Sequence, residues 1–225
     1  MMRPAFACAA FAAALLTATG ASAQSPEVSW NIGVVSDYVF RGVSQTDEEP
    51  AIQGGVDLTA GGFYVGAWGS NVDFGDDTDA EFDVYAGYRA EAAGFALDFG
   101  AVGYGYAGAP DGADYGYLEL KAAASRAVGP ASFGVQVYWS PDFFGPDEEA
   151  TYVEANAAFA LAPKWTVSGA VGHQALDVSD DYTTWNAGVG YALTGNVGID
   201  VRYIGSDLDI PLADDRIVGG LKFTF

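Results

Sequence analysis

The sequence is poor in charge, and most of the charge that it has is of one sign. Only 17% of its 225 residues are charged, with 30 Asp and Glu against 9 Lys and Arg, for a net charge of −21. A nucleic-acid partner requires a basic surface, so this composition disfavours nucleic-acid binding. The hydrophobic share of 50% and the aromatic share of 14% disfavour intrinsic disorder. We therefore expect a folded, very acidic protein.

Long apolar runs, cysteine and histidine are scarce as well. A transmembrane helix needs about 20 consecutive apolar residues, and beyond the N-terminus Gly, Asp, Asn or Ser interrupts every apolar run. The single cysteine, Cys8, excludes a disulfide framework, and the single histidine, His173, excludes a histidine-based metal cluster. We expect neither a helical membrane protein nor a bound cofactor or metal.

The N-terminus has the pattern of a secretory signal peptide. Arg3 supplies a positive charge, residues 5–16 are apolar, and Ala21-Ser22-Ala23 forms a small-residue cleavage site. A membrane anchor is the alternative, but the apolar run is short for one. We predict that residues 1–23 are cleaved and that residues 24–225 form one domain.

Apolar and polar residues alternate through most of residues 24–225. Phe82 and Val84, for example, alternate with Glu81 and Asp83. Side chains of a β-strand point alternately to opposite faces, so this period predicts strands with one apolar and one polar face. About twelve such segments of roughly 8 to 13 residues follow one another, close to the ~9–11 residues of a membrane-spanning strand.

The connections between these segments alternate between long and short. Twenty of the 30 acidic residues lie in the six long connections, beside one basic residue, Arg41. The short turns centre on residues 61–62, 93–94, 129–130, 162–163 and 195–196. The long connections cover about residues 41–50, 73–80, 107–114, 141–150, 176–181 and 205–215.

These patterns predict an all-β fold, a transmembrane antiparallel up-and-down β-barrel of about 12 strands. Its apolar face would contact lipid, with short periplasmic turns and longer acidic extracellular loops. A soluble β-sandwich would show the same alternation. Aromatic residues near both strand ends favour the membrane barrel, and Tyr38 and Phe40 are assigned to the belt near the long connections.

The last segment ends on a phenylalanine with apolar residues at every second position. Leu221, Phe223 and Phe225 resemble the C-terminal assembly signal of bacterial outer-membrane barrels. The resemblance implies the barrel-assembly machinery and outer-membrane lipid as partners, and the outer membrane of a Gram-negative bacterium as the location.

A denser resemblance covers about residues 30–75. Its motifs are residues 36–46 (SDYVFRGVSQT), residues 50–55 (PAIQGG) and Gly66-x-Trp68-x-Ser70-Asn71. Together they resemble the TorF family of porin-like proteins, a proteobacterial group of conserved hypothetical proteins. The resemblance implies an outer-membrane protein that forms a pore, and it implies neither a particular substrate nor catalytic residues.

The first long connection has two interpretations. An Asp37–Arg41 pair could hold a folded-in loop, with Gly42 allowing the chain to turn and Ser44, Gln45 and Thr46 bonding within the loop. Alternatively, the loop narrows the mouth of the pore. The two interpretations are compatible.

Three other chemistries have weak support. Residues 103–108 match G-x-G-x-x-G but lack the following helix of a dinucleotide site. His173 would suit an outer-membrane phospholipase, yet the chain places no serine two residues away on its face. The acidic groups at residues 73–79 and 207–215 lack the spacing of a calcium loop and favour solvated loops. We predict no enzymatic activity.

The polar strand faces would line the barrel and carry more acids than bases. We predict a channel for passive diffusion of small hydrophilic solutes, weakly cation-preferring. The alternative is a closed barrel, plugged by salt bridges, with a structural or surface-binding role. Glycines on the inner face favour free space and hence the channel. The candidate pore-lining residues are Asp37, Arg41, Asp57, Glu81, Asp83, Arg89, Asp98, Glu119, Lys121, Glu154, Asp200, Arg202 and Lys222.

Overall fold

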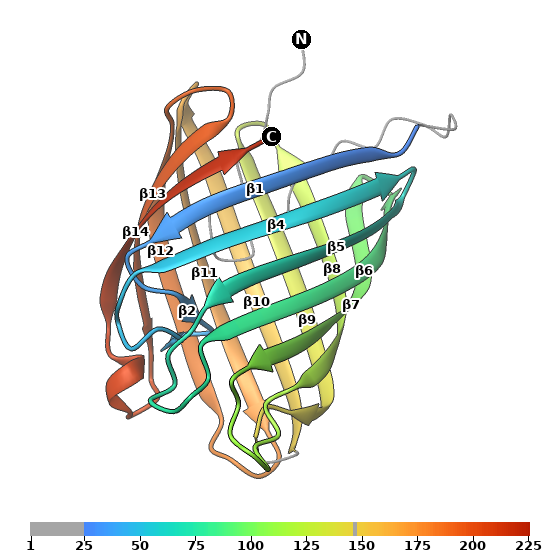
Figure 1. Ribbon diagram of the computed structural model, residues 1–225. Coiled ribbons are helices and arrows are strands. Elements are labelled where there is room, and N and C mark those ends of the chain that lie inside the picture. Colours follow the sequence, from blue (N-terminus) through green and yellow to red (C-terminus); the bar gives the residue numbers. More distant parts are fainter. Residues whose placement is uncertain (1–24, 146–147) are drawn as a thin grey trace.

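Twelve antiparallel strands close into one barrel in the computed structural model, which describes residues 25–145 and 148–225 (Figure 1). Each strand pairs with the next along the chain, and β1 pairs with β14 to close the sheet. The predicted all-β, up-and-down barrel of about 12 strands is confirmed, whereas the predicted signal peptide lies outside the described residues. The barrel strands are β1 (Glu27–Val35), β4 (Ala51–Ala60), β5 (Phe63–Asn71), β6 (Ala80–Ala92), β7 (Phe95–Ala107), β8 (Tyr117–Val128), β9 (Ala131–Phe143), β10 (Glu148–Ala162), β11 (Trp165–Leu176), β12 (Tyr182–Ala192), β13 (Val197–Ser206) and β14 (Arg216–Thr224).

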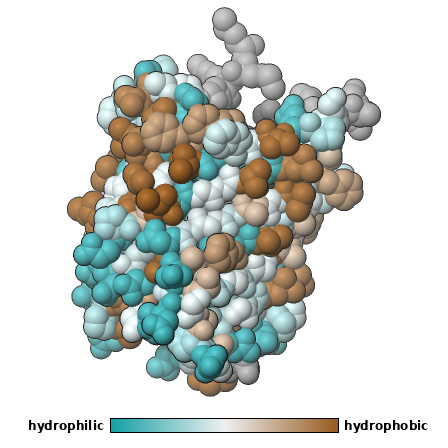
Figure 2. Space-filling model, in the orientation of Figure 1, coloured by the Kyte–Doolittle hydropathy of each residue, from teal (hydrophilic) through white to brown (hydrophobic). Residues whose placement is uncertain are grey.

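The apolar face of the barrel points outward. On β6, Phe82 and Val84 are 55% and 62% exposed, whereas Glu81 and Asp83 between them are 2% and 1% exposed. Hydrophobic residues gather over the upper part of the face seen in Figure 2, and hydrophilic residues gather at its lower end. A soluble sandwich would bury the face that is exposed here. A closed sheet with this orientation satisfies its backbone hydrogen bonds without water on its outer side.

The two ends of the barrel differ in their connections. The end that carries the short turns, here called the turn end, has connections at 61–62, 93–94, 129–130, 163–164 and 193–196. The opposite end, the loop end, carries the longer ones, including the 3₁₀ helix η1 (Pro211–Ala213). The predicted loop at 141–150 is too long, because β9 continues to Phe143 and β10 begins at Glu148. No helix in the described part of the chain is long and apolar enough to cross a membrane.

The first long connection folds inward instead of extending β1. Its residues form a small hairpin of β2 (Val39–Phe40) and β3 (Val43–Ser44), which Figure 1 shows within the outline of the barrel. Arg41 and Gly42 join the two strands with φ values of 46° and 84°, as in the two-residue turns of tight hairpins. Tyr38 and Phe40 are therefore buried or half-buried inside, and their predicted place in the outer aromatic belt is wrong.

The C-terminal residue takes part in closing the barrel. Phe225 exchanges two backbone hydrogen bonds with Trp30, at 2.8 and 3.1 Å between nitrogen and oxygen. The two rings stack with their centroids 4.4 Å apart. The seam between the first and last strands thus ends in an aromatic pair at the turn end.

We predict that Phe225→Ala weakens this seam. The ring pair contributes about 1 kcal/mol beyond its buried area, so the variant should unfold from its compact, heat-modifiable form at a lower temperature on semi-native gels. Val128→Ala, an exposed outer residue near the same end, is the control. Equal melting of the two variants would contradict the role given to the Trp30–Phe225 pair.

Candidate functional site

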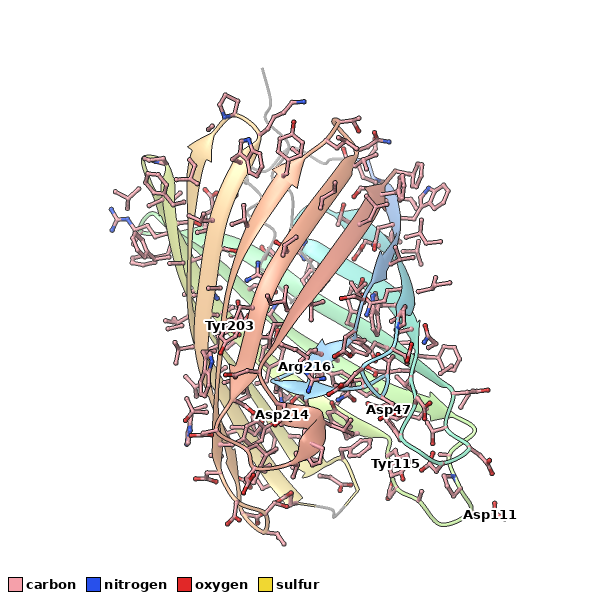
Figure 3. All side chains as sticks on the ribbon, turned by 90° about the vertical axis from the view of Figure 1, so that its left-hand side faces the viewer. Asp47, Asp111, Tyr115, Tyr203, Asp214 and Arg216 are labelled. Atoms are coloured by element: carbon pink, nitrogen blue, oxygen red, sulfur yellow. The ribbon has the colours of Figure 1, made fainter. Side chains whose placement is uncertain are left out.

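The base of the hairpin is fixed by one buried carboxylate. Asp37 accepts a hydrogen bond from Ser44 Oγ at 2.7 Å and lies 3.1 Å from Thr46 Oγ1. It also forms an ion pair with Arg216, 2.7 Å from its Nη1, at the start of β14. Figure 3 shows Arg216 beside Asp214 at the lower end of the barrel, facing the hairpin. The Asp37–Arg41 pair suggested by the sequence is wrong, because Asp37 pairs with Arg216.

The tip of the hairpin reaches the wall opposite β1. Arg41 forms a bidentate ion pair with Glu119 of β8, with nitrogen–oxygen distances of 2.7 and 2.8 Å. Its Nη1 also donates to Gln174 Oε1 of β11 at 3.0 Å. In the closed order of strands, β8 to β11 lie opposite β1, so the hairpin and this side chain together cross the lumen.

Aromatic rings surround the Arg41 guanidinium. Its central carbon lies 4.4 Å from the centroid of Tyr152, 5.2 Å from Tyr138 and 6.0 Å from Phe143, all on the facing wall. Phe40, on the hairpin itself, lies at 4.7 Å. Such distances allow cation–π attraction, which is stronger where water is excluded. We call Glu119, Gln174, Tyr138, Phe143 and Tyr152 the guanidinium receptor.

The Arg41–Glu119 pair is almost completely buried. The side chains are 5% and 1% exposed. Burial lowers the pKa of Arg41, but the Glu119 carboxylate outweighs that effect, and the pKa of Arg41 is raised above its ordinary value. The guanidinium thus stays charged inside the barrel. Breaking a buried pair of this kind by removing one partner typically costs about 3–5 kcal/mol.

Two further carboxylates lie beneath the hairpin without a basic partner. Tyr38 donates to Glu81 at 3.2 Å, and both oxygens of Asp83 lack a hydrogen-bond partner among the described residues. Burial, followed by the charges of Glu81 and Asp83, raises the pKa of Tyr38 well above its ordinary value, so its hydroxyl remains a donor. This part of the lumen therefore keeps an excess of acidic groups.

The half of the lumen nearer the turn end is more open and more evenly charged. Lys121 and Arg89 both pair with Asp98, at 2.8 and 3.6 Å, and the Arg89 and Asp98 side chains are 32% and 15% exposed. Arg202 pairs with Asp200 at 3.2 Å. Arg89, Asp98, Lys121 and Asp200 keep partial contact with water, whereas Arg202 is as buried as Arg41.

Glycines of the wall make room for large inner side chains. A Cβ on Gly172 would meet the ring of Tyr152, and one on Gly188 would come 2.9 Å from the Arg202 guanidinium. The same holds for Gly87 and Gly100, which lie under Tyr64. The expectation that inner glycines mean free space is wrong at these positions, because neighbouring side chains occupy that space.

The structure brings the sequence-predicted residues into three groups. Near the hairpin, Arg41 pairs with Glu119, Asp37 pairs with Arg216, and Glu81 accepts a hydrogen bond from Tyr38, with Asp83 on the same strand. Away from the hairpin, Asp57 accepts a hydrogen bond from Tyr85, and Glu154 accepts one from Gln136, both at 2.8 Å. The remaining candidates, Arg89, Asp98, Lys121, Asp200, Arg202 and Lys222, lie on the inner face of their strands, most of them paired as described.

The sequence interpretation missed the inner tyrosines and Arg216. Tyr104 donates to Glu119 at 2.9 Å and stacks on Tyr117 with centroids 4.2 Å apart. Tyr104 and Tyr106 alternate with glycines, which is a usable signal, because a tyrosine in the polar phase of a strand must point inward. Arg216 gave no such signal, since its partner Asp37 is 179 positions away.

The weaker alternatives receive no support from the geometry. His173 is exposed on the outer wall, and its cross-strand partners are Val153 and Thr183, so neither neighbouring strand supplies a serine opposite it. In the loops, Asp76 accepts hydrogen bonds from Thr78 and Tyr115, and Figure 3 shows Tyr115 at the lower, loop end of the barrel. Among the described residues no group of three or more His, Cys, Asp or Glu side chains could hold a metal ion.

Comparisons with known proteins agree with the fold. Residues 18–221 match the model of a family described as "Bacterial protein of unknown function (Gcw_chp)". No curated protein matches the chain. Three similar solved structures are the KdgM porin in complex with disordered oligogalacturonate, with TM-score 0.63, the NanC porin, 0.55, and an outer-membrane channel from Pseudomonas putida F1, 0.54.

The similarity to these structures extends over nearly whole chains at low sequence identity. The identities are 10%, 9% and 11%, and the matches cover 89%, 88% and 92% of this chain. They cover 99%, 98% and 97% of the respective structures. Identities this low establish a shared barrel architecture.

We predict that Asp37→Ala releases the hairpin. The change leaves Arg216 without its buried partner and removes the acceptor of Ser44, so the segment should open locally. Trypsin should then cleave after Arg41, which is buried in the wild type, and the fragment is identified by mass. Asp76→Ala, in a different loop, is the control. If trypsin cleaves Asp37→Ala after Arg41 at the wild-type rate, Asp37 does not anchor the hairpin.

Proposed function

The chain belongs to the Gcw_chp family of bacterial proteins, and we propose that it is an outer-membrane channel for passive diffusion of small hydrophilic solutes. The observation that carries the proposal is the inverted barrel, with an apolar outer wall around a charged lumen. A bilayer stabilises this orientation, and water does not. The porin and channel architectures of the similar structures support it.

The hairpin sets the width of this channel. Arg41 and its receptor fill the lumen near the loop end, while charged groups nearer the turn end remain accessible to water. The described conformation is thus constricted at one level. Passage of a solute requires Arg41 to leave Glu119, at least transiently.

The charges favour cations. Near the hairpin the inner face carries the acidic side chains Glu81, Asp83 and Glu119, of which Glu119 pairs with Arg41. Acidic loops at the same end add to the negative potential, and carboxylates in a narrow pore attract cations. The KdgM porin is described in complex with disordered oligogalacturonate, whereas we propose cations as the preferred solutes here.

A closed barrel with a structural or surface-binding role is the alternative, and one observation favours it. The buried Arg41–Glu119 pair, together with the anchor at Asp37, plugs the lumen in the described conformation. The two functions differ in whether the plug moves. Ion conductance decides between them.

The remaining assignments are part of the same proposal. Residues 1–23 would be a cleaved signal peptide, and Leu221, Phe223 and Phe225 would be read by the barrel-assembly machinery. The long connections would face the cell exterior of a Gram-negative bacterium. The resemblance to the TorF family is compatible with these assignments, and we propose no enzymatic activity.

We predict that the purified protein conducts ions in planar bilayers and prefers cations. The reversal potential in a KCl gradient measures the preference, which should be modest because the lumen carries both signs of charge. Protein that inserts without conducting would favour the closed barrel. A clear preference for chloride would contradict the charge argument.

We also predict that Arg41→Ala raises the conductance several-fold. The change removes the side chain that joins the tip of the hairpin to the facing wall, and the residues of the wall are unchanged. Arg126→Ala is the matched control, since Arg126 lies at the turn end beside Phe95, away from the hairpin. An unchanged single-channel conductance and open probability in Arg41→Ala would show that the constriction lies elsewhere.

A further inference from the structure

The guanidinium receptor belongs to the barrel wall and not to the hairpin. Glu119 comes from β8, Tyr138 and Phe143 from β9, Tyr152 from β10 and Gln174 from β11. Only Phe40, among the groups that surround the guanidinium, moves with Arg41. When the hairpin withdraws, these five side chains therefore remain together on one wall.

The five side chains have the chemistry of a cation-binding site. The carboxylate accepts two hydrogen bonds in the fork geometry that suits a planar guanidinium, and Gln174 supplies a third acceptor. Three rings at 4.4 to 6.0 Å complete the set. Aromatic cages that include a carboxylate recognise guanidinium and substituted ammonium groups in the same way.

The wall also holds the receptor in place without Arg41. Tyr104 donates to Glu119 Oε2, and Tyr152 Oη lies 2.9 Å from Thr184 Oγ1 and 3.2 Å from a carboxylate oxygen of Glu154. Gln174 differs from these two residues, because its Oε1 bonds to Arg41 and its Nε2 has no hydrogen-bond partner among the described residues. Glu119 and Tyr152 are thus supported by neighbours that the hairpin does not supply.

Withdrawal of Arg41 would leave Glu119 as a buried carboxylate with only a tyrosine donor. The ionised form of such a group is strongly destabilised unless a cation replaces the lost partner or the carboxylate takes up a proton. The backbone of residues 41–48 is strained, because Arg41, Asp47 and Glu48 all have positive φ values, which non-glycine residues rarely adopt. Figure 3 shows Asp47 at the loop end, where it is exposed.

We propose that the guanidinium receptor is a binding site for small organic cations that carry a guanidinium or ammonium group, and that Arg41 is its tethered occupant in the closed channel. This inference rests on the proposed channel function and names its solute class. A solute cation and Arg41 compete for Glu119. Binding of the solute therefore stabilises the conformation in which the hairpin has left the lumen.

Arg41→Ala provides the test, with guanidinium chloride as the probe at low millimolar concentration, far below denaturing levels. The variant empties the receptor and leaves its five wall residues unchanged. In planar bilayers, guanidinium should block the potassium current of Arg41→Ala at a concentration at least tenfold lower than in the double variant R41A/E119Q. The wild type should need a higher concentration than Arg41→Ala, because the tethered guanidinium competes.

A second readout does not depend on conductance. Guanidinium at the same concentration should raise the thermal unfolding temperature of Arg41→Ala and not that of R41A/E119Q, against its general denaturing tendency. Arg41→Gln replaces Arg41→Ala if the latter fails to give the compact, heat-modifiable form. Arg126→Ala should behave as the wild type in both measurements.

The outcomes separate this inference from the proposed function. If Arg41→Ala and R41A/E119Q both conduct and guanidinium blocks them equally, the proposed binding site is wrong. The proposed channel function is not affected by that result. Absence of conductance in every variant would overturn the channel, and a Glu119-dependent rise in unfolding temperature would still support the cation site. Absence of both effects overturns both proposals.

Discussion

The arrangement of the lumen depends on one buried ion pair. Arg41 and Glu119 meet across the barrel, the first at the tip of a hairpin and the second on the opposite wall. Because an unpaired charge is unfavourable in a buried site, each residue holds the other in place. The hairpin consequently lies across the lumen instead of over its mouth, and the aromatic side chains of the facing wall pack around its tip.

The charge pattern follows from the same pair. Near the hairpin, Arg41 pairs with Glu119, which is one of three buried carboxylates on the wall. Toward the turn end, Asp98 and Asp200 have basic partners and keep some contact with water. The acidic connections at the loop end, together with the carboxylates of the lumen, are the basis for the proposal that cations are the permeant species.

Local patterns in the sequence predicted the barrel, because strand alternation and turn length are local properties. The alternation of Phe82 and Val84 with Glu81 and Asp83 is enough to assign each side chain to the outer or the inner face. The six acidic connections all lie at one end of the barrel. The hairpin could not be predicted in detail, since its partners are distant. Asp37 pairs with Arg216, and Arg41 pairs with Glu119, only once the barrel has closed. Nothing in residues 36–46 indicates which of the two distant residues each would pair with.

The coupling between Arg41 and Glu119 in channel opening tests the central claim most directly. A double-mutant cycle of R41A, E119Q and R41A/E119Q, measured as open probability in planar bilayers, isolates that coupling. If the pair closes the lumen, each single variant opens the channel, and the double variant opens it no further than R41A alone. Independent, additive effects of the two changes, or no effect of E119Q, would contradict the account.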